Sequence, residues 1–253
     1  MQIQGLRAMI VGGASGMARA TAERIAAGGG KVAILDRPGS AGAEVAAAIG
    51  GGYFECNILD FEGTEKVIEE AVNWLGGLDA CVTTAGGGIG KRTLTQDGPH
   101  PLDEFRGVVD LNLNATFNIS RLAAWHMSKN EPNADDERGV IINTSSIAAF
   151  EGQIGQIAYT ASKAGVAGMC LTMARDLGSF GIRVNAIAPS LFDTGITAGI
   201  PDDFKAPLVK DAAFPKRMGR PDEYARLALA IIDNPMLNGG CIRLDAGQRF
   251  APK

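Results

Sequence analysis

The chain has 253 residues, of which 46% are hydrophobic and 21% charged, and its formal net charge is −4. This composition is that of a folded globular protein, which argues against a disordered or fibrous chain. The negative charge argues against a nucleic-acid partner. No run of about 18 apolar residues predicts a membrane helix, and the N-terminus shows no signal-peptide pattern. We therefore expect a soluble, cytoplasmic protein with one domain over residues 1–253, since α/β folds of this size commonly form one unit.

A glycine-rich turn follows the first expected strand, at 8–11, and opens a helix at about 17–27. Gly12 allows a tight exit from the strand, and Gly16 lets the backbone approach a pyrophosphate. The helix N-terminus adds free N–H groups and a positive dipole end. A glycine pair at this spacing also occurs where a helix packs closely, but its place between strand and helix favours a phosphate-binding turn.

The second expected strand, at 31–35, ends in Asp36, about twenty residues after the glycines. A carboxylate at this position accepts hydrogen bonds from adenosine ribose hydroxyls and repels a 2′-phosphate. The sequence therefore predicts NAD rather than NADP. The neighbouring Arg37 could instead bind a 2′-phosphate, and a simple turn carboxylate is the other alternative for Asp36.

Strands and helices continue to alternate along the chain. We expect further strands at 53–56, 80–83, 139–143, 183–187 and 241–244, and further helices at 61–75, 102–129, around Tyr159 to about 180, and 222–232. This order predicts a doubly wound, Rossmann-type α/β fold with about seven parallel strands and helices on both faces, and ligands at the carboxyl ends of the strands. Residues 88–104 are expected as a polar loop, 130–139 as a solvated acidic loop, and 194–217 as a substrate lid.

Tyr159 and Lys163 are four residues apart, so on a helix they share one face. A nearby ammonium favours phenolate and lowers the pKa of a phenol, so Tyr159 could exchange a proton with an alcohol. Ser146 lies thirteen residues earlier, after an apolar run, and could hold the same oxygen. An isolated pair of this kind is usually solvated, but Gly12, Asp36 and Ser146 all fall at the carboxyl ends of expected strands.

Asparagine is a poor helix former, so Asn112 and Asn114 inside the expected helix at 102–129 raise the question of what their side-chain amides contact. The simplest expectation is that both face solvent. The four cysteines include no CxxC pair and are expected as buried reduced thiols. The two histidines, His100 and His126, have no metal-like partner, so no metal site is expected.

These residues occur in an order that resembles the short-chain dehydrogenase/reductase family over essentially the whole chain. The resemblance implies that Tyr159 is the general acid/base and that Lys163 lowers the Tyr159 pKa and holds the nicotinamide ribose. It implies that Ser146 anchors the substrate oxygen, that Asn112 positions a water for proton relay, and that Thr194 binds the carboxamide. The expected catalytic residues are Asn112, Ser146, Tyr159 and Lys163, and the expected NAD-binding residues are Gly12, Ser15, Gly16, Met17, Asp36, Asn57, Ile58, Ala85, Gly86, Tyr159, Lys163, Pro189, Phe192 and Thr194.

Within the family, three segments resemble a branch that oxidises 3-hydroxyacyl-CoA with NAD: NEPNADDERGVIINTSSIAAFEGQIGQIAYTASKAG, IAPSLFDT and NPMLNGGCIRLDAGQR. The resemblance implies a role in fatty-acid metabolism and a homotetramer. The first alternative is a dehydrogenase for a hydroxysteroid or another hydrophobic secondary alcohol, and the second is a protein that binds NAD without turnover. Cations in the loops could meet CoA phosphates, and apolar side chains could line a steroid cleft; these are Lys91, Arg92, Lys205, Lys210, Lys216 and Arg217, and Ile154, Leu191, Phe192 and Phe214.

Overall fold

Apolar strands form one parallel sheet at the centre of the molecule. The computed structural model describes residues 1–194 and 207–252. Within these residues the sheet has seven strands in the order β3-β2-β1-β4-β7-β8-β9, and every neighbouring pair is parallel. The strands are β1 (Arg7–Val11), β2 (Lys31–Asp36), β3 (Gly52–Glu55), β4 (Ala80–Thr83), β7 (Gly139–Thr144), β8 (Ile182–Pro189) and β9 (Cys241–Leu244). The predicted doubly wound fold is confirmed.

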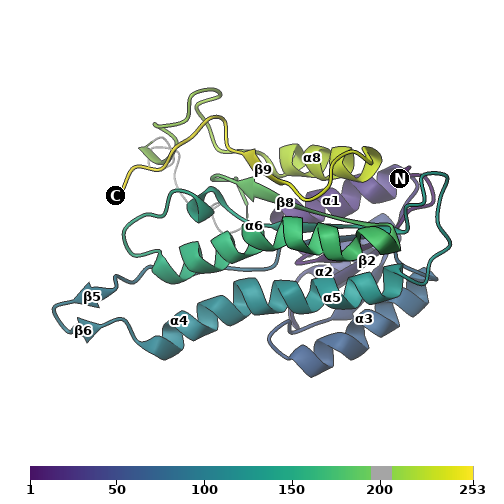
Figure 1. Cartoon of the computed structure of the whole chain (residues 1–253), viewed down its shortest axis with the longest axis horizontal. Helices are drawn as coiled ribbons and strands as arrows, with labels where there is room; N and C mark the ends of the chain where they lie inside the picture. Colours follow the sequence, from purple (N-terminus) through teal and green to yellow (C-terminus); the bar gives the residue numbers. More distant parts are fainter. Residues whose placement is uncertain (195–206, 253) are drawn as a thin grey trace.

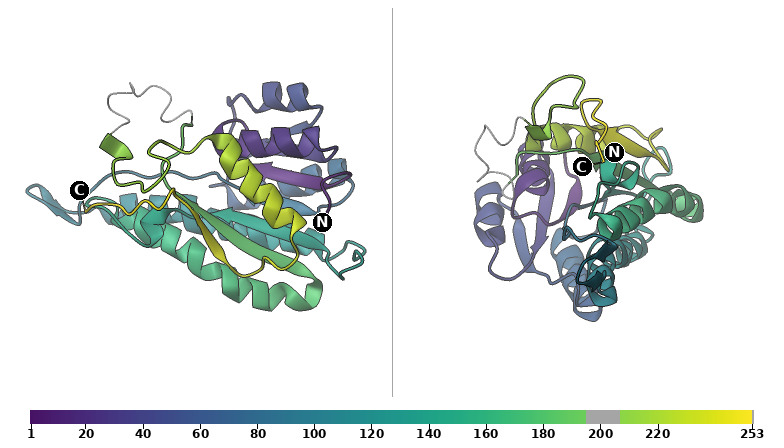
Figure 2. Two further views of the ribbon diagram at one scale, coloured as in Figure 1. Left: turned by 90° about the horizontal axis from the view of Figure 1, so that it is seen from above. Right: turned by 90° about the vertical axis from the view of Figure 1, so that its left-hand side faces the viewer.

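Helices cover both faces of this sheet (Figures 1 and 2). One layer contains α1 (Gly16–Ala27), α2 (Gly42–Ile49) and α8 (Pro221–Asp233), and the other contains α3 (Phe61–Leu75), α4 (Leu102–Val109), α5 (Ala115–Met127) and α6 (Ile157–Leu177). Successive side chains of a strand point to opposite faces. Met9 therefore packs in the core under α3 and α5, whereas Ile10 packs under α1 and α8.

The order of the strands reverses between β1 and β4. The chain runs outward from β1 through β2 to β3 and then returns to place β4 on the other side of β1. In open α/β sheets a ligand crevice forms at such a switch point, outside the carboxyl ends of the strands. Gly12 follows β1 and Thr84 follows β4, so both border this crevice.

Three local features differ from the sequence expectations. The helix α2 was not expected at all. The loop at 88–104 contains a short hairpin, β5 (Leu94–Thr95) and β6 (Gly98–Pro99), which projects from one end of the molecule (Figure 1). The helix expected at 102–129 contains a π-helical segment, η1 (Asp110–Asn114). Half of the expected lid at 194–217, namely residues 195–206, lies outside the described residues.

The acidic loop at 130–139 is largely exposed as expected, but Glu137 is buried. Its carboxylate accepts hydrogen bonds from Arg183 of β8 at 2.7 Å. The same guanidinium donates to the main-chain oxygens of Ile231, Ile232 and Leu237 at 2.8–2.9 Å. The expectation of a solvated loop was therefore wrong at Glu137, because this carboxylate compensates a buried cation that holds the end of α8 to the sheet.

We predict that Glu137→Gln lowers the free energy of unfolding by about 2 to 4 kcal/mol, because it leaves the Arg183 charge buried without a counter-charge. Chemical denaturation measures this change. The matched control is Glu65→Gln, which removes an exposed carboxylate 3.9 Å from Arg121. An exposed ion pair contributes little, so the control should change stability by less than about 1 kcal/mol. Equal stability of the two variants would show that the buried pair is not a constraint on this fold.

Candidate active site

Two adjacent cavities open at the carboxyl ends of the strands. One, of about 540 Å³, lies over β1, β2 and β4, and the other, of about 510 Å³, lies over β7 and α6. Both are bounded by the same four residues, namely Met17, Thr84, Gly86 and Thr194. The two cavities therefore form the halves of one cleft.

The structure brings all of the predicted cofactor-binding residues to this cleft. The first half is lined by Gly12, Ser15, Gly16, Met17, Asp36, Asn57, Ile58, Ala85, Gly86 and Thr194. The second half is lined by Tyr159, Lys163, Pro189, Phe192 and Thr194, together with Met17 and Gly86. Their contacts with a cofactor remain predictions, but their common location agrees with them.

The glycine turn fits a phosphate group because side chains are excluded from it. Gly12 has φ +85° and Gly16 has φ +55°, a region that favours glycine. A Cβ atom on Gly12 would lie 2.9 Å from the main-chain nitrogen of Ala85. The helix α1 begins at Gly16, so its free N–H groups and positive dipole end lie at the same turn.

Asp36 ends β2 beside this turn. Its Oδ2 accepts a hydrogen bond from the main-chain nitrogen of Ala14 at 2.9 Å, and its Oδ1 accepts one from that of Arg37 at 2.8 Å. Two main-chain donors thus fix the carboxylate at the mouth of the first half of the cleft, where Arg37 is also a lining residue. A fixed carboxylate has free lone pairs for ribose hydroxyls and would repel a 2′-phosphate.

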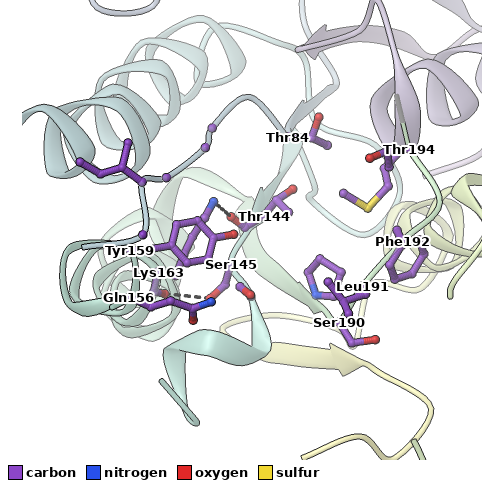
Figure 3. Close-up of a pocket in the computed structure, with 18 residues that line it drawn as sticks. Thr84, Thr144, Ser145, Gln156, Tyr159, Lys163, Ser190, Leu191, Phe192 and Thr194 are labelled. Atoms are coloured by element: carbon purple, nitrogen blue, oxygen red, sulfur yellow. Dashed lines mark hydrogen bonds between the residues drawn. The ribbon is translucent and has the colours of Figure 1, made fainter. Parts of the chain in front are cut away.

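Ser146, Tyr159 and Lys163 meet in the second half of the cleft. Ser146 follows β7, and its hydroxyl accepts a hydrogen bond from the main-chain nitrogen of Ala148 at 3.1 Å. Tyr159 and Lys163 lie in the first two turns of α6. Figure 3 shows both on one wall of the cavity, opposite the segment from Ser190 to Thr194. This arrangement places a hydroxyl, a phenol and an ammonium around one apolar space.

The Lys163 ammonium is buried, and its side chain donates to the main-chain oxygen of Thr144 at 2.8 Å (Figure 3). The main-chain oxygen of Lys163 in turn accepts from the Ser145 hydroxyl at 2.8 Å. Burial lowers the pKa of Lys163 to about 8, because the charged form loses its hydration. Lys163 thus keeps its charge at neutral pH and loses it in the mildly alkaline range.

The expected lowering of the Tyr159 pKa by Lys163 is wrong for this structure. Burial raises the pKa of Tyr159, and the hydroxyl of Ser146 only partly offsets this rise. The Lys163 Nζ lies 5.7 Å from the centre of the Tyr159 ring and is directed to Thr144. The loss of solvent around the phenol therefore outweighs the nearby cation, and the phenol holds its proton at neutral pH.

Asn112 lies in η1 and is fully buried, so the expectation of a solvent-facing amide is wrong there. Its Nδ2 donates to the main-chain oxygens of Gly87 and Val108 at 2.6 and 2.8 Å, and its Oδ1 accepts from the Gly87 nitrogen at 3.1 Å. Asn112 therefore fixes the loop after β4, which forms part of both cavities. Asn114 is exposed, as expected.

The cavity is also lined by residues that were not predicted as site residues, among them Thr84, Thr144 and Gln156. Thr144 acts through a main-chain oxygen, which has no sequence signature. Gln156 precedes α6 by one residue, so its position before Tyr159 was the available signal. In the described residues, no group of His, Cys, Asp and Glu is arranged to hold a metal ion. No helix among the described residues is long and apolar enough to cross a membrane.

The chain is similar to known proteins over nearly its full length. A family model described as short chain dehydrogenase matches residues 7–204. The 3-hydroxyacyl-CoA dehydrogenase type-2 of Drosophila melanogaster is 44% identical over 248 residues, covering 96% of this chain and 97% of that protein. The Homo sapiens protein of the same name is 44% identical over 254 residues, covering 99% of this chain and 97% of that protein.

Solved structures give the same result. The crystal structure of 3-hydroxyacyl-CoA dehydrogenase type-2 from Mycobacterium avium superposes with a TM-score of 0.94, at 41% identity and with 98% of both chains covered. A 7α-hydroxysteroid dehydrogenase complexed with NADH and 7-oxo glycochenodeoxycholic acid superposes with a TM-score of 0.88, at 27% identity, covering 100% of this chain and 97% of that chain. The family model, the full-length identity and the shared fold together identify the chain as a member of the short-chain dehydrogenase family and as an NAD-dependent oxidoreductase.

Proposed function

We propose that the protein interconverts 3-hydroxyacyl-CoA and 3-ketoacyl-CoA with NAD, as an enzyme of fatty-acid metabolism. The observation that carries the reaction type is the meeting of Ser146, Tyr159 and Lys163 in a cavity joined to the glycine-turn half of the cleft. The substrate class is supported by the relatives named 3-hydroxyacyl-CoA dehydrogenase type-2, which match this chain over nearly its full length.

In this proposal the protein supplies proton transfer and position. NAD, held by the glycine turn and Asp36, would supply the hydride acceptor. In the oxidation, Tyr159 as phenolate takes the hydroxyl proton of the substrate while the C–H bond at the same carbon breaks and the carbonyl forms. Ser146 hydrogen-bonds the substrate oxygen, and the Lys163 ammonium stabilises the phenolate. In the reduction, the neutral phenol returns the proton to the oxygen.

Asn112 is proposed to contribute by position. Its amide fixes the Gly87 backbone from both sides, so the loop after β4 keeps a constant place in the cleft. The family resemblance also assigns Asn112 a water for proton relay from Lys163, which stays a prediction. Thr194 lines both halves of the cleft and is proposed to bind the carboxamide.

The surroundings of the cavity bear on the choice between a CoA ester and a steroid. Two of the cations considered for CoA phosphates are already paired: Lys91 with Glu104 at 2.7 Å, and Arg217 with Glu223 at 2.7 Å. Arg92 lines a neighbouring cavity of about 530 Å³, as does Ile154.

The apolar residues considered for a steroid cleft are also divided. Leu191 and Phe192 line the catalytic cavity, whereas the Phe214 side chain is 85% exposed. The apolar wall at 191–192 keeps the hydroxysteroid alternative open, and the 7α-hydroxysteroid dehydrogenase fold agrees with it.

We also propose a homotetramer in the cytoplasm. The helices α5 and α6 present large exposed apolar side chains, namely Phe117, Trp125 and Leu171, which suit subunit interfaces. The thiols of Cys56, Cys81 and Cys170 are buried and unpaired, and that of Cys241 is partly buried. Free thiols are typical of proteins from a reducing compartment.

The first test is NADH formation from NAD with 3-hydroxybutyryl-CoA, beside a 17β-hydroxysteroid and with NADP as the control cofactor. We expect the CoA ester to give the higher kcat/KM. A preference for the steroid would contradict the proposed substrate class and support the alternative. Binding of NAD without turnover of either substrate would support the second alternative, a protein that binds NAD without catalysis.

The second prediction concerns pH. Burial raises the Tyr159 pKa, so the phenolate needed for oxidation becomes more populated as pH rises, and the oxidation rate should increase from about pH 6 to pH 8. The reduction starts from the neutral phenol and leaves a phenolate, which the Lys163 ammonium stabilises. The reduction rate should therefore fall above pH 8 as Lys163, with a pKa of about 8, loses its proton. Initial rates in both directions measure these profiles.

The variant Tyr159→Phe should lose about 10²- to 10⁴-fold in kcat in both directions, because it lacks the proton-transferring group. The matched control is Tyr53→Phe, which removes a hydroxyl that donates to the Arg37 main-chain oxygen at 3.2 Å. Wild-type rates in Tyr159→Phe would exclude Tyr159 as the acid/base.

A further prediction concerns cofactor choice. Asp36→Asn keeps an oxygen that can accept from the Ala14 nitrogen but removes the charge that repels a 2′-phosphate. We expect the ratio of kcat/KM for NADP to that for NAD to rise about tenfold or more, which corresponds to about 1.4 kcal/mol. Asp97→Asn in the exposed β5–β6 hairpin is the control. An unchanged ratio in Asp36→Asn would mean that another group sets the preference.

A further inference from the structure

A buried tyrosine reaches the catalytic wall from the opposite helix layer. Tyr224 belongs to α8 and has no exposed surface. Its hydroxyl lies 2.7 Å from the Oγ1 of Thr144, the last residue of β7. Tyr224 packs in the core under α1 and α8, on the face of the sheet away from α6. A phenyl ring would fill this part of the core almost equally well, so packing alone does not account for the hydroxyl.

The direction of the hydrogen bond follows from its partners. Thr144 Oγ1 is also 2.7 Å from the main-chain oxygen of Thr83, which can only accept. Thr144 therefore gives its single proton to Thr83, and the Tyr224 hydroxyl donates to Thr144. The Thr144 side chain is thus held from β4 and from α8 at the same time.

The carbonyl of this same residue accepts from Lys163 Nζ at 2.8 Å. Lys163 is 3% exposed, and in the described residues the hydrogen bond of its ammonium goes to a main-chain oxygen and not to a carboxylate. The groups facing its ammonium are the Tyr159 ring on its own helix, Gly86 of the loop after β4, and the uncharged amide of Asn112 beside Gly86. The orientation of the Thr144 peptide therefore decides how well the ammonium is held.

We propose that Tyr224 is a positioning residue for the reaction, whose hydroxyl fixes Thr144 so that the Thr144 carbonyl holds the Lys163 ammonium beside Tyr159. Tyr224 touches neither substrate nor cofactor in this role. The inference rests on the proposed function of Tyr159 and Lys163. It assigns to α8 a part in the catalytic geometry beyond its packing on the sheet.

The test is Tyr224→Phe, with Tyr53→Phe as the control; these two residues and Tyr159 are the three tyrosines of the chain. We expect kcat to fall about tenfold at pH 8 while the substrate KM stays within about twofold, since the ammonium would be held less well and the phenolate less stabilised. Tyr53→Phe should retain wild-type values. A fall in kcat in the control equal to that in Tyr224→Phe would overturn the inference.

A second readout is independent of turnover. The ¹³Cε resonance of Lys163, assigned by its loss in Lys163→Arg, gives the midpoint of the lysine titration in the protein without substrate. Loss of a fixed carbonyl partner disfavours the ammonium, so the midpoint in Tyr224→Phe should lie below that of the wild type by about half a pH unit. If neither substrate class is turned over, this titration still tests whether Tyr224 affects Lys163. A failure of the proposed function can therefore be distinguished from a failure of the inference about Tyr224.

Thr144→Val provides a second route to the same bond without altering α8. Thr144→Val removes the bond to Thr83 as well as the bond to Tyr224, so it should lower kcat at least as much as Tyr224→Phe. The double variant should be no worse than Thr144→Val alone, because Tyr224→Phe removes only a bond that Thr144→Val has already removed. Thr144→Ser keeps the hydroxyl and should lower kcat less than Thr144→Val does. The inference is overturned if Tyr224→Phe lowers the melting temperature but leaves kcat and the Lys163 midpoint unchanged, since the hydroxyl would then serve packing stability alone.

Discussion

The arrangement of Tyr159 and Lys163 in the cleft depends on one hydrogen bond, from the buried Lys163 ammonium to the Thr144 carbonyl. A buried charge that has lost its water must be stabilised by fixed dipoles, and the Thr144 carbonyl at the end of β7 supplies one. Ser145, the next residue, binds the Lys163 main chain, and Ser146 follows with its hydroxyl at the cavity. Thr144 and Ser145 thus attach α6 to the sheet, and Ser146 presents a polar group to the cavity. The register of β7 with its neighbours therefore sets the place of the whole catalytic wall.

Most of the fold could be predicted because its signals are local. Buried parallel strands are continuous apolar runs, and glycines mark the turns after them. The elements that were missed lack such signals. The β5–β6 hairpin has two-residue strands whose side chains are mostly exposed, so no hydrophobic alternation marks it. The π segment at 110–114 continues a helical pattern, and its Asn112 bonds to the loop after β4. A contact between residues 25 apart is not visible in local periodicity.

For the site, too, local patterns could be predicted from the sequence and long-range contacts could not. The spacing of Tyr159 and Lys163 and the glycine turn are local patterns, and they located both halves of the cleft. The Tyr159 pKa was predicted in the wrong direction because burial is a tertiary property: a helix pair four residues apart suggests contact, but the ammonium is directed to a carbonyl instead. Thr144 was missed because it binds Lys163 through its main-chain oxygen, which no sequence pattern marks. Tyr224 was missed because it contacts Thr144 across 80 residues of sequence.

The loop after β4 explains why burial dominates the pKa values of both Tyr159 and Lys163. A Cβ atom on Gly86 would lie 3.3 Å from Lys163 Nζ, and one on Gly88 would lie 2.9 Å from the Tyr159 ring. Only glycine lets this backbone approach so closely, and Asn112 keeps it there. Close approach removes water from both groups, which raises the pKa of the phenol and lowers that of the ammonium. The resting site therefore holds a neutral phenol, and the phenolate forms at a cost that new positive charge or a hydrogen-bonded substrate oxygen would reduce.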